Sequence, residues 1–196
     1  MNPSAPITNI KNKLLQPQIA IATLLIAVVA YLERAGRSWM APDNSLLFWY
    51  GEANGPGTSQ HLLDPYSFTH FLHGFAFCWL ILLVGKRLSH LWQLTFTIAL
   101  EAGWEMLENS EAIIRRYREA TIALGYNGDS IINSLSDILV CSIGFIVAKK
   151  LGFKKSLLLF VLVELFLLIW IRDSLTINVI MLICPVEAIK VWQAAG

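Results

Sequence analysis

The chain has 196 residues, of which 56% are hydrophobic and 15% are charged. Water-soluble domains carry roughly 45–50% apolar and about 25% charged residues, so this composition excludes an ordinary soluble protein and indicates an integral membrane protein in a lipid bilayer. The 15 basic and 14 acidic side chains give a net charge of +1, which excludes nucleic acid as the main partner. The three cysteines fit neither a disulfide framework nor a zinc-binding spacing.

Six apolar runs predict an all-α bundle of about six transmembrane helices, forming a single membrane domain over residues 1–196. The runs lie at about 14–32, 66–84, 88–107, 131–148, 156–171 and 175–192. Each has roughly 16–20 residues, close to the length that a helix needs to cross a hydrocarbon core. Pro185, Glu187 and Lys190 interrupt the last run, so it is predicted as either a kinked span or a helix lying in the interface.

Two longer polar connections, 33–65 and 110–128, join these spans. The second connection has apolar or neutral side chains at helical spacing and arginines between them: Ile113, Ile114, Tyr117, Thr121 and Leu124, with Arg115, Arg116 and Arg118. This pattern predicts an amphipathic helix on the membrane surface that ends near Gly125.

The distribution of lysine and arginine favours an orientation with both termini in the cytoplasm. The inner side then carries nine basic residues and the outer side six. The nine are Lys11, Lys13, Lys86, Arg87, the four lysines within 149–155, and Lys190. In this orientation the two long connections face the outside.

The charged residues within the predicted spans are mostly acidic. Six carboxylates fall there against a single lysine: Glu101, Glu105, Glu108, Asp137, Glu164 and Glu187. A charge near the bilayer centre costs about 2.5–3.5 kcal/mol on insertion scales, and intramembrane ionisable residues usually mark functional sites. These carboxylates therefore have to be protonated, paired from outside the spans, or neutralised by a cation.

Helical spacing places several of these carboxylates near two histidines. Three spans each carry one set on a single face: His70 and His73 on the second, Glu101, Glu105 and Glu108 on the third, and Asp129, Asn133 and Asp137 on the fourth. All these residues lie toward the outer ends of their helices. We expect them to meet in one pocket beneath the two outer connections.

Imidazoles and carboxylates on neighbouring helices are ligands for zinc, manganese or iron. The first hypothesis is therefore a metal-dependent membrane enzyme that acts on a lipid-like or envelope substrate near the outer leaflet. The predicted metal ligands are His70, His73, Glu105, Glu108, Asp129 and Asp137. Glu101 is the predicted catalytic base. The predicted substrate-binding residues are Arg116, Arg118 and Asn133, and the arginines would bind an anionic head group.

Structural roles stay open for some of these residues. Asp129 or Ser130 stands where the fourth span begins and suits a helix N-cap. Glu108 lies near the end of its span and suits an ion pair with an arginine of 115–118. The sequence has no nucleophile elbow, no H-E-x-x-H pattern and no P-loop.

Two other classes of function also stay open. A small ion- or proton-coupled transporter would need a polar path to the inner side, which Glu164 and Glu187 would have to continue. An accessory membrane protein would use the polar network only to fix helix packing. Gly74, Gly103 and Gly144 are isolated in the sequence, so helix association would then depend on polar contacts.

Several blocks of the chain resemble an uncharacterised proteobacterial family. The blocks lie at 59–74, 101–109, 116–137 and 172–193, and the longest includes RYREATIAL, GDS and NSxxD. They are similar to a group of small multi-pass inner-membrane proteins known as a domain of unknown function. The resemblance implies an inner-membrane location and a shared site, and it supplies no substrate.

Overall fold

A computed structural model describes residues 5–123 and 125–195, with side chains from residue 16 onward. The side chains of Lys11 and Lys13, and the whole of Leu124, lie outside the described residues. The described chain forms seven helices: α1 (Ala5–Arg34), α2 (Ser67–Val84), α3 (His90–Glu108), α4 (Glu111–Ala120), α5 (Ile131–Trp170), α6 (Leu175–Ile183) and α7 (Glu187–Ala194). The all-α prediction is confirmed for this part of the chain.

Within the described part of the chain, three helices are long and apolar enough to cross a membrane: α1 over Gln16–Arg34, α2, and α5. The six predicted spans are therefore shown only in part. The third predicted run does form a helix, α3, but its buried polar residues, Glu101 and Glu105 among them, make it less apolar than these three.

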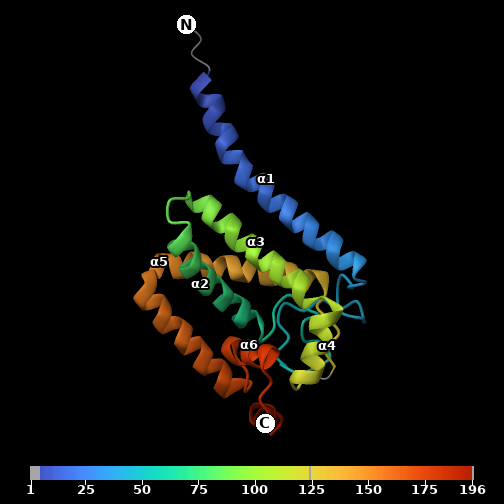
Figure 1. The fold of residues 1–196 in the computed structure, drawn as a ribbon. Coiled ribbons are helices and arrows are strands. Elements are labelled where there is room, and N and C mark those ends of the chain that lie inside the picture. Colours follow the sequence, from blue (N-terminus) through green and yellow to red (C-terminus); the bar gives the residue numbers. More distant parts are fainter. Residues whose placement is uncertain (1–4, 124, 196) are drawn as a thin grey trace.

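Helix α5 is two arms joined by a bend. Gly152 has φ 71° and ψ 167°, which lies outside the helical region and which glycine adopts without steric cost. The arms coincide with the fourth and fifth predicted runs, and the two lysine pairs at 149–150 and 154–155 flank the bend. Figure 1 shows the arms as a V. The second arm therefore returns toward the end of the bundle where α5 begins.

The last predicted run does not form a single span. It divides into α6 and α7, of nine and eight residues, on either side of Pro185. Such helices are roughly 12–14 Å long and are too short to cross a core of about 30 Å. The Lys190 ammonium donates to the carbonyl of Glu119 in α4. The predicted orientation places Lys190 on the inner side of the membrane and residues 110–128 on the outer side. Because these two segments are in contact, that placement is wrong for Lys190.

Helices α2 and α5 cross where two glycines meet. A Cβ on Gly74 would overlap the carbonyl oxygen of Cys141, and a Cβ on Gly144 would overlap that of Phe71. The two glycines are isolated in sequence but together form the close contact that small residues provide between helices. Beyond the crossing, an apolar cluster fills the space between α2 and α5: Phe75, Cys78, Ile81, Phe145 and Ala148.

Helix α3 runs beside α1 (Figure 1). Val28 and Leu32 of α1 pack with Ile98 and Ala102 of α3 in a second buried apolar cluster. This contact fixes one side of α3. The adjoining part of the α3 surface carries Glu101 and Glu105, which contact His70 of α2.

The two long connections cover the end of the bundle where α2 and α5 begin. The first connection supplies the carbonyls of Ser38, Trp39 and Ser59, which accept the N–H groups of Ile131, Ile132 and Ser130 at the start of α5. The second contains α4, so the predicted helix is confirmed over Glu111–Ala120, short of Gly125, and its position on the membrane surface stays a prediction. The polar side chains of the three central helices therefore lie beneath a folded cover.

Candidate metal centre

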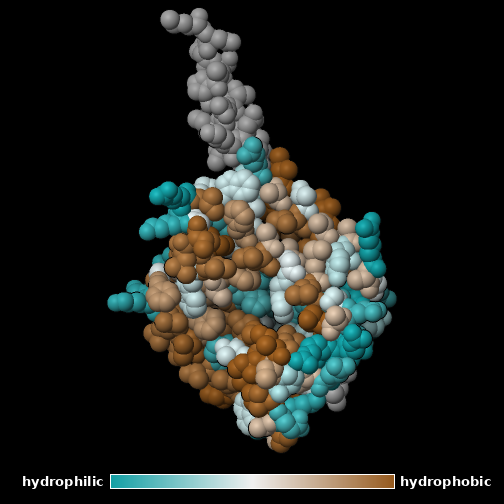
Figure 2. All heavy atoms as spheres, viewed as in Figure 1, coloured by the Kyte–Doolittle hydropathy of each residue, from teal (hydrophilic) through white to brown (hydrophobic). Residues whose placement is uncertain are grey.

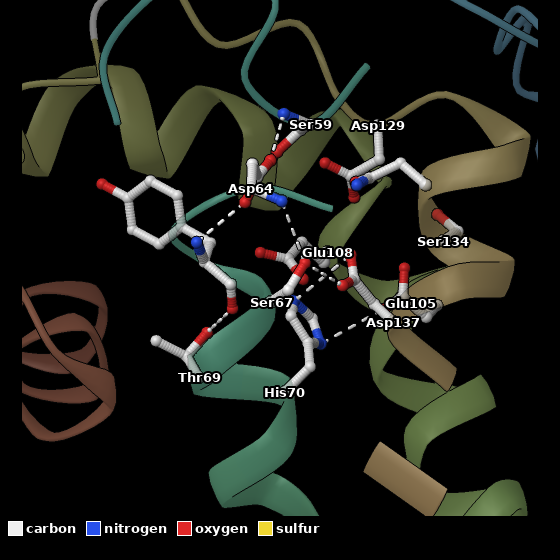
Figure 3. Close-up of polar contacts among 12 residues, drawn as sticks. Ser59, Asp64, Ser67, Thr69, His70, Glu105, Glu108, Asp129, Ser134 and Asp137 are labelled. Carbon is white, nitrogen blue, oxygen red and sulfur yellow. Dashed lines mark hydrogen bonds and ion pairs between the residues drawn. The ribbon is translucent and has the colours of Figure 1, made fainter. Parts of the chain in front are cut away.

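The histidines of α2 and the glutamates of α3 meet as predicted, and Asp137 of α5 lies beside them, whereas Asp129 and Asn133 of the same predicted pocket bond elsewhere. His70 and His73 lie in the first two turns of α2, and Glu101, Glu105 and Glu108 lie in the last turns of α3. These helices are antiparallel, so the start of one lies beside the end of the other. Figure 3 shows His70, Glu105, Glu108 and Asp137 pointing toward one another from α2, α3 and α5.

Glu101 is in contact with both imidazoles. Its Oε1 lies 2.6 Å from Nδ1 of His70, and its two oxygens lie 3.1 and 3.0 Å from Nδ1 of His73. Glu101 is fully buried. Each of the three residues offers one ligand atom, and these atoms lie within 4.8 Å of one another. This is a suitable spacing for one metal ion, with two nitrogen ligands and one oxygen ligand.

Glu105 lies next to this triad and forms no hydrogen bond with any residue that the structure describes. It is fully buried, and neither carboxylate oxygen has a donor. Nδ1 of His70 is 3.4 Å from Oε1 of Glu105 but lies closer to Glu101. A buried carboxylate without a partner is costly, so this group requires a proton or a cation. Glu105, Glu108 and His70 form a second set of ligand atoms within 4.8 Å.

Glu108 is only half satisfied. Its Oε1 accepts the hydroxyl of Tyr117 at 2.8 Å, whereas its Oε2 is buried without a partner. The structure therefore gives Glu108 a tyrosine partner from α4, and not the predicted arginine. Burial raises the pKa of Tyr117 well above its usual value, which keeps this hydroxyl protonated as a donor.

Asp137 lies on the other side of the His70 ring. Its Oδ2 is 3.8 Å from Nε2 of His70, and its Oδ1 accepts the hydroxyl of Ser67 at 3.0 Å. A carboxylate behind an imidazole fixes the ring's orientation and tautomer in many metal sites. This position suits Asp137 for orienting His70, although the sequence predicts a ligand role for it.

Asp129 belongs to a separate hydrogen-bonded network. Its Oδ2 accepts from Nδ2 of Asn109 at 2.8 Å, its Oδ1 accepts from the hydroxyl of Tyr126 at 2.9 Å, and its own N–H donates to Oδ1 of Asn109 at 2.7 Å. Burial raises the pKa of Asp129, and the bonds from Asn109 and Tyr126 oppose that rise. Asp129 is in neither metal-ligand set. The N-cap of α5 is Ser130, whose Oγ accepts from the N–H of Asn133.

The predicted substrate-binding residues lie outside the histidine and carboxylate cluster. Arg116 donates to the carbonyls of Leu182 and Ile183 at the end of α6, and Asn133 donates to the carbonyl of His61. Arg118 donates to the carbonyl of Tyr126 and to Oδ1 of Asn127. The structure thus supplies protein partners for all three side chains, and their binding of substrate stays a prediction.

Asp64 is a buried polar residue that the sequence reasoning missed. Its oxygens accept the N–H groups of Ser59 and Tyr66 at 2.6 and 2.7 Å, and its own N–H donates to Oγ of Ser67. Burial raises the pKa of Asp64, and the two accepted N–H bonds oppose that rise. The Asp64-Pro65 pair before α2 is a turn signal that could have revealed this position. Through Ser67, Asp64 supports Asp137 and hence His70.

Comparison with known proteins places the chain in an uncharacterised family. The family model described as "Protein of unknown function (DUF2585)" matches residues 32–195, so the chain belongs to this family. It is 42% identical over 177 residues to the UPF0314 protein of Sphingopyxis alaskensis, which covers 90% of this chain and 93% of the relative. No solved structure matches the chain.

Other relatives cover the chain to a similar extent. The UPF0314 protein of Paracoccus denitrificans is 42% identical over 176 residues, which is 89% of this chain and 91% of the relative. A UPF0314 protein of Agrobacterium fabrum is 41% identical over 174 residues, or 89% of this chain and 88% of that protein. The resemblance to an uncharacterised proteobacterial family is thereby confirmed.

Proposed function

We propose that this chain is an integral inner-membrane protein that binds a divalent metal ion and acts with it on a lipid-like or envelope substrate. Glu105 carries the proposal, because this fully buried carboxylate has no donor among the described residues on either oxygen and lies beside the His70 imidazole. A cation at His70, His73 and Glu101 would supply the missing positive charge. Two nitrogens and one oxygen suit zinc, manganese or iron.

The residues of the cluster divide into three roles. His70, His73 and Glu101 are assigned as ligands, because both imidazoles already converge on the Glu101 carboxylate. A bound divalent ion polarises a substrate oxygen and makes a bound water more acidic. Glu105 is assigned as the carboxylate that balances the charge of the ion and strengthens its binding, because its oxygens have no other partner among the described residues. Asp137 orients His70 from the other side of the ring.

The surroundings of His73 favour a lipid-like substrate. The His73 side chain is 13% exposed, whereas that of Glu101 is fully buried. The rings of Phe77 and Trp104 lie 5.7 Å from the His73 ring. The approach to the metal ligands is therefore lined by aromatic side chains on the flank of two helices, where a substrate could enter from the bilayer.

The transporter alternative fits the structure less well. Past the crossing of Gly74 and Gly144, the space between α2 and α5 is filled by an apolar cluster that includes Phe75 and Phe145. Glu164 lies on the second arm of α5 and accepts bonds from Ser174 and Thr176, and Glu187 is exposed. Neither glutamate continues a polar path from the histidine cluster toward the bend of α5.

Elemental analysis of the full chain purified in detergent tests the metal site. We expect close to one zinc, manganese or iron ion per chain, and loss of most of it in Glu105→Gln and His73→Ala. His90→Ala is the matched control, because His90 is an exposed histidine at the opposite end of α3. Its metal content should equal that of the unmodified protein.

Folding and metal loss have to be separated in this test. Each variant is therefore checked by circular dichroism, and metal is added back before the measurement is repeated. A folded unmodified chain that binds no divalent ion after add-back would contradict the proposal. Equal metal loss in the His90→Ala control would also contradict it.

A further inference from the structure

The end of the bundle opposite the histidine cluster is basic. The α2–α3 turn carries Lys86 and Arg87, and lysine pairs at 149–150 and 154–155 flank the bend of α5. The sequence has no acidic residue from 85 to 100 or from 138 to 163. Among the side chains that the structure describes, every ion pair involves a histidine, so these lysines have no carboxylate partner. The positive charge at this end is therefore not neutralised within the described protein.

An apolar groove opens at this basic end. It has a volume of about 600 Å³ and lies between the first half of α3 and the end of the first arm of α5. Its lining includes the apolar side chains of Leu94, Phe145 and Ile146 together with Lys149 and Lys150. Figure 2 shows hydrophilic side chains projecting beside hydrophobic surface on the side where Figure 1 draws the bend of α5.

Lys149 is held in place by a neutral partner and an aromatic ring. Its ammonium donates to Oε1 of Gln93 and lies 5.5 Å above the Phe145 ring. Gln93 is buried and is itself fixed by bonds from its Nε2 to the carbonyls of Gly85 and Leu88. A neutral partner positions the ammonium but leaves its full charge available to an anion.

We propose that this groove binds an anionic phospholipid, with an acyl chain along Leu94, Phe145 and Ile146 and the phosphate at Lys149 and Lys150. The unpaired positive charge of the lysines favours binding of an anion. Basic pockets between membrane helices bind anionic lipid head groups for this reason. The apolar wall indicates that the anion has a hydrocarbon chain attached. The proposal rests on the membrane location proposed above and does not depend on the metal site.

Native mass spectrometry of the full chain in detergent tests this site. The probes are phosphatidylglycerol and phosphatidylcholine with the same acyl chains. We expect the unmodified protein to retain phosphatidylglycerol at least about tenfold better, and the double variant Lys149→Gln/Lys150→Gln to lose roughly 20- to 30-fold in affinity. The control pair Lys154→Gln/Lys155→Gln lies outside the groove and should change affinity by less than about threefold, because salt screens distant charges.

Three results would overturn the lipid site. They are equal retention of the two lipids, an equal loss in the control pair, and displacement of the lipid by inorganic phosphate at the same concentration. If the double variant does not fold, Lys150→Gln alone tests the same contact at an exposed position, with an expected loss of about fivefold. Metal content is measured in the same samples, so that an unmodified chain that holds metal but shows no preference for phosphatidylglycerol would refute this proposal alone.

Discussion

Asp129 and Glu105 are both buried carboxylates, yet their surroundings differ completely. Asp129 accepts hydrogen bonds from Asn109 and Tyr126 on separate oxygens, whereas Glu105 accepts none. A satisfied carboxylate stabilises the fold, and an unsatisfied one destabilises it unless a proton or cation is bound. The difference teaches that the Asp129 network joins the connections to the helices through hydrogen bonds, while Glu105 is left with the unpaired charge that the proposed cation would balance.

Removing the amide that supports Asp129 should have the largest effect on stability. Asn109→Ala removes two bonds to Asp129 and leaves a buried carboxylate with one donor, so we expect a loss of about 3 kcal/mol. Thermal unfolding in detergent measures it. Asn54→Ala, at an exposed position, is the matched control and should stay within about 0.5 kcal/mol. A small effect of Asn109→Ala would mean that the bonds from Asn109 to Asp129 do not stabilise the fold.

A third carboxylate, Asp173, extends the comparison to pH. Burial raises its pKa from 3.8 to about 6, against bonds from Ser174 and Tyr66. Because the folded state favours the protonated form, this stabilisation is complete below about pH 4 and is lost as the pH rises past about 6. The loss should be on the order of 2–3 kcal/mol. Asp173→Asn should weaken this dependence between pH 4 and 7.5, and an unchanged pH profile in that variant would refute the assignment.

Removing the Tyr126 hydroxyl tests whether Asp129 contributes to stability and not to metal binding. Tyr126→Phe removes the donor to Oδ1 of Asp129 and should cost about 1–2 kcal/mol in the free energy of unfolding. The same variant should leave the metal content unchanged, because Asp129 is in neither ligand set. Chemical unfolding and elemental analysis of one preparation test both statements. Metal loss without destabilisation would mean that Asp129 takes part in metal binding and does not stabilise the fold.

Glu105→Gln should have the smallest effect on the stability of the metal-free protein. The substitution removes an unpartnered buried carboxylate, so the free energy of unfolding should stay the same or rise by up to about 1 kcal/mol. In the presence of saturating metal, the unmodified protein should gain stability and the variant should not. Unfolding curves with and without added metal give this comparison. A large loss of stability in the metal-free variant would make Glu105 a structural residue.

The sequence was most informative where a site depends on local periodicity. The i, i+3 spacing of His70 and His73 and the i, i+4 spacing of Glu101 and Glu105 predicted shared helix faces, and the structure brings these faces together. Asp129 shares the spacing of Asp137 but lies in another network, because Asn109 reaches it from the end of α3 and Tyr126 from the second connection. Periodicity within one helix cannot predict such partners.

Helix pairing and the length of the last helices were harder to predict. Gly74 and Gly144 are far apart in the chain and become a close contact only when α2 crosses α5. The run at 175–192 is apolar enough to suggest a span, but the break at Pro185 leaves two helices of nine and eight residues. Which helices pack together depends on the whole bundle and cannot be predicted from the periodicity of a single sequence.

X-ray absorption spectroscopy of the full chain loaded with zinc tests the central claim most directly. We predict scattering from two imidazoles at about 2.0–2.1 Å together with carboxylate oxygen, and a drop to one imidazole in His73→Ala. A zinc ion with two imidazole ligands in the unmodified chain and one in the variant would place the metal at the His70, His73 and Glu101 triad. Zinc bound through oxygen or sulfur alone, or an unchanged spectrum in His73→Ala, would contradict the account.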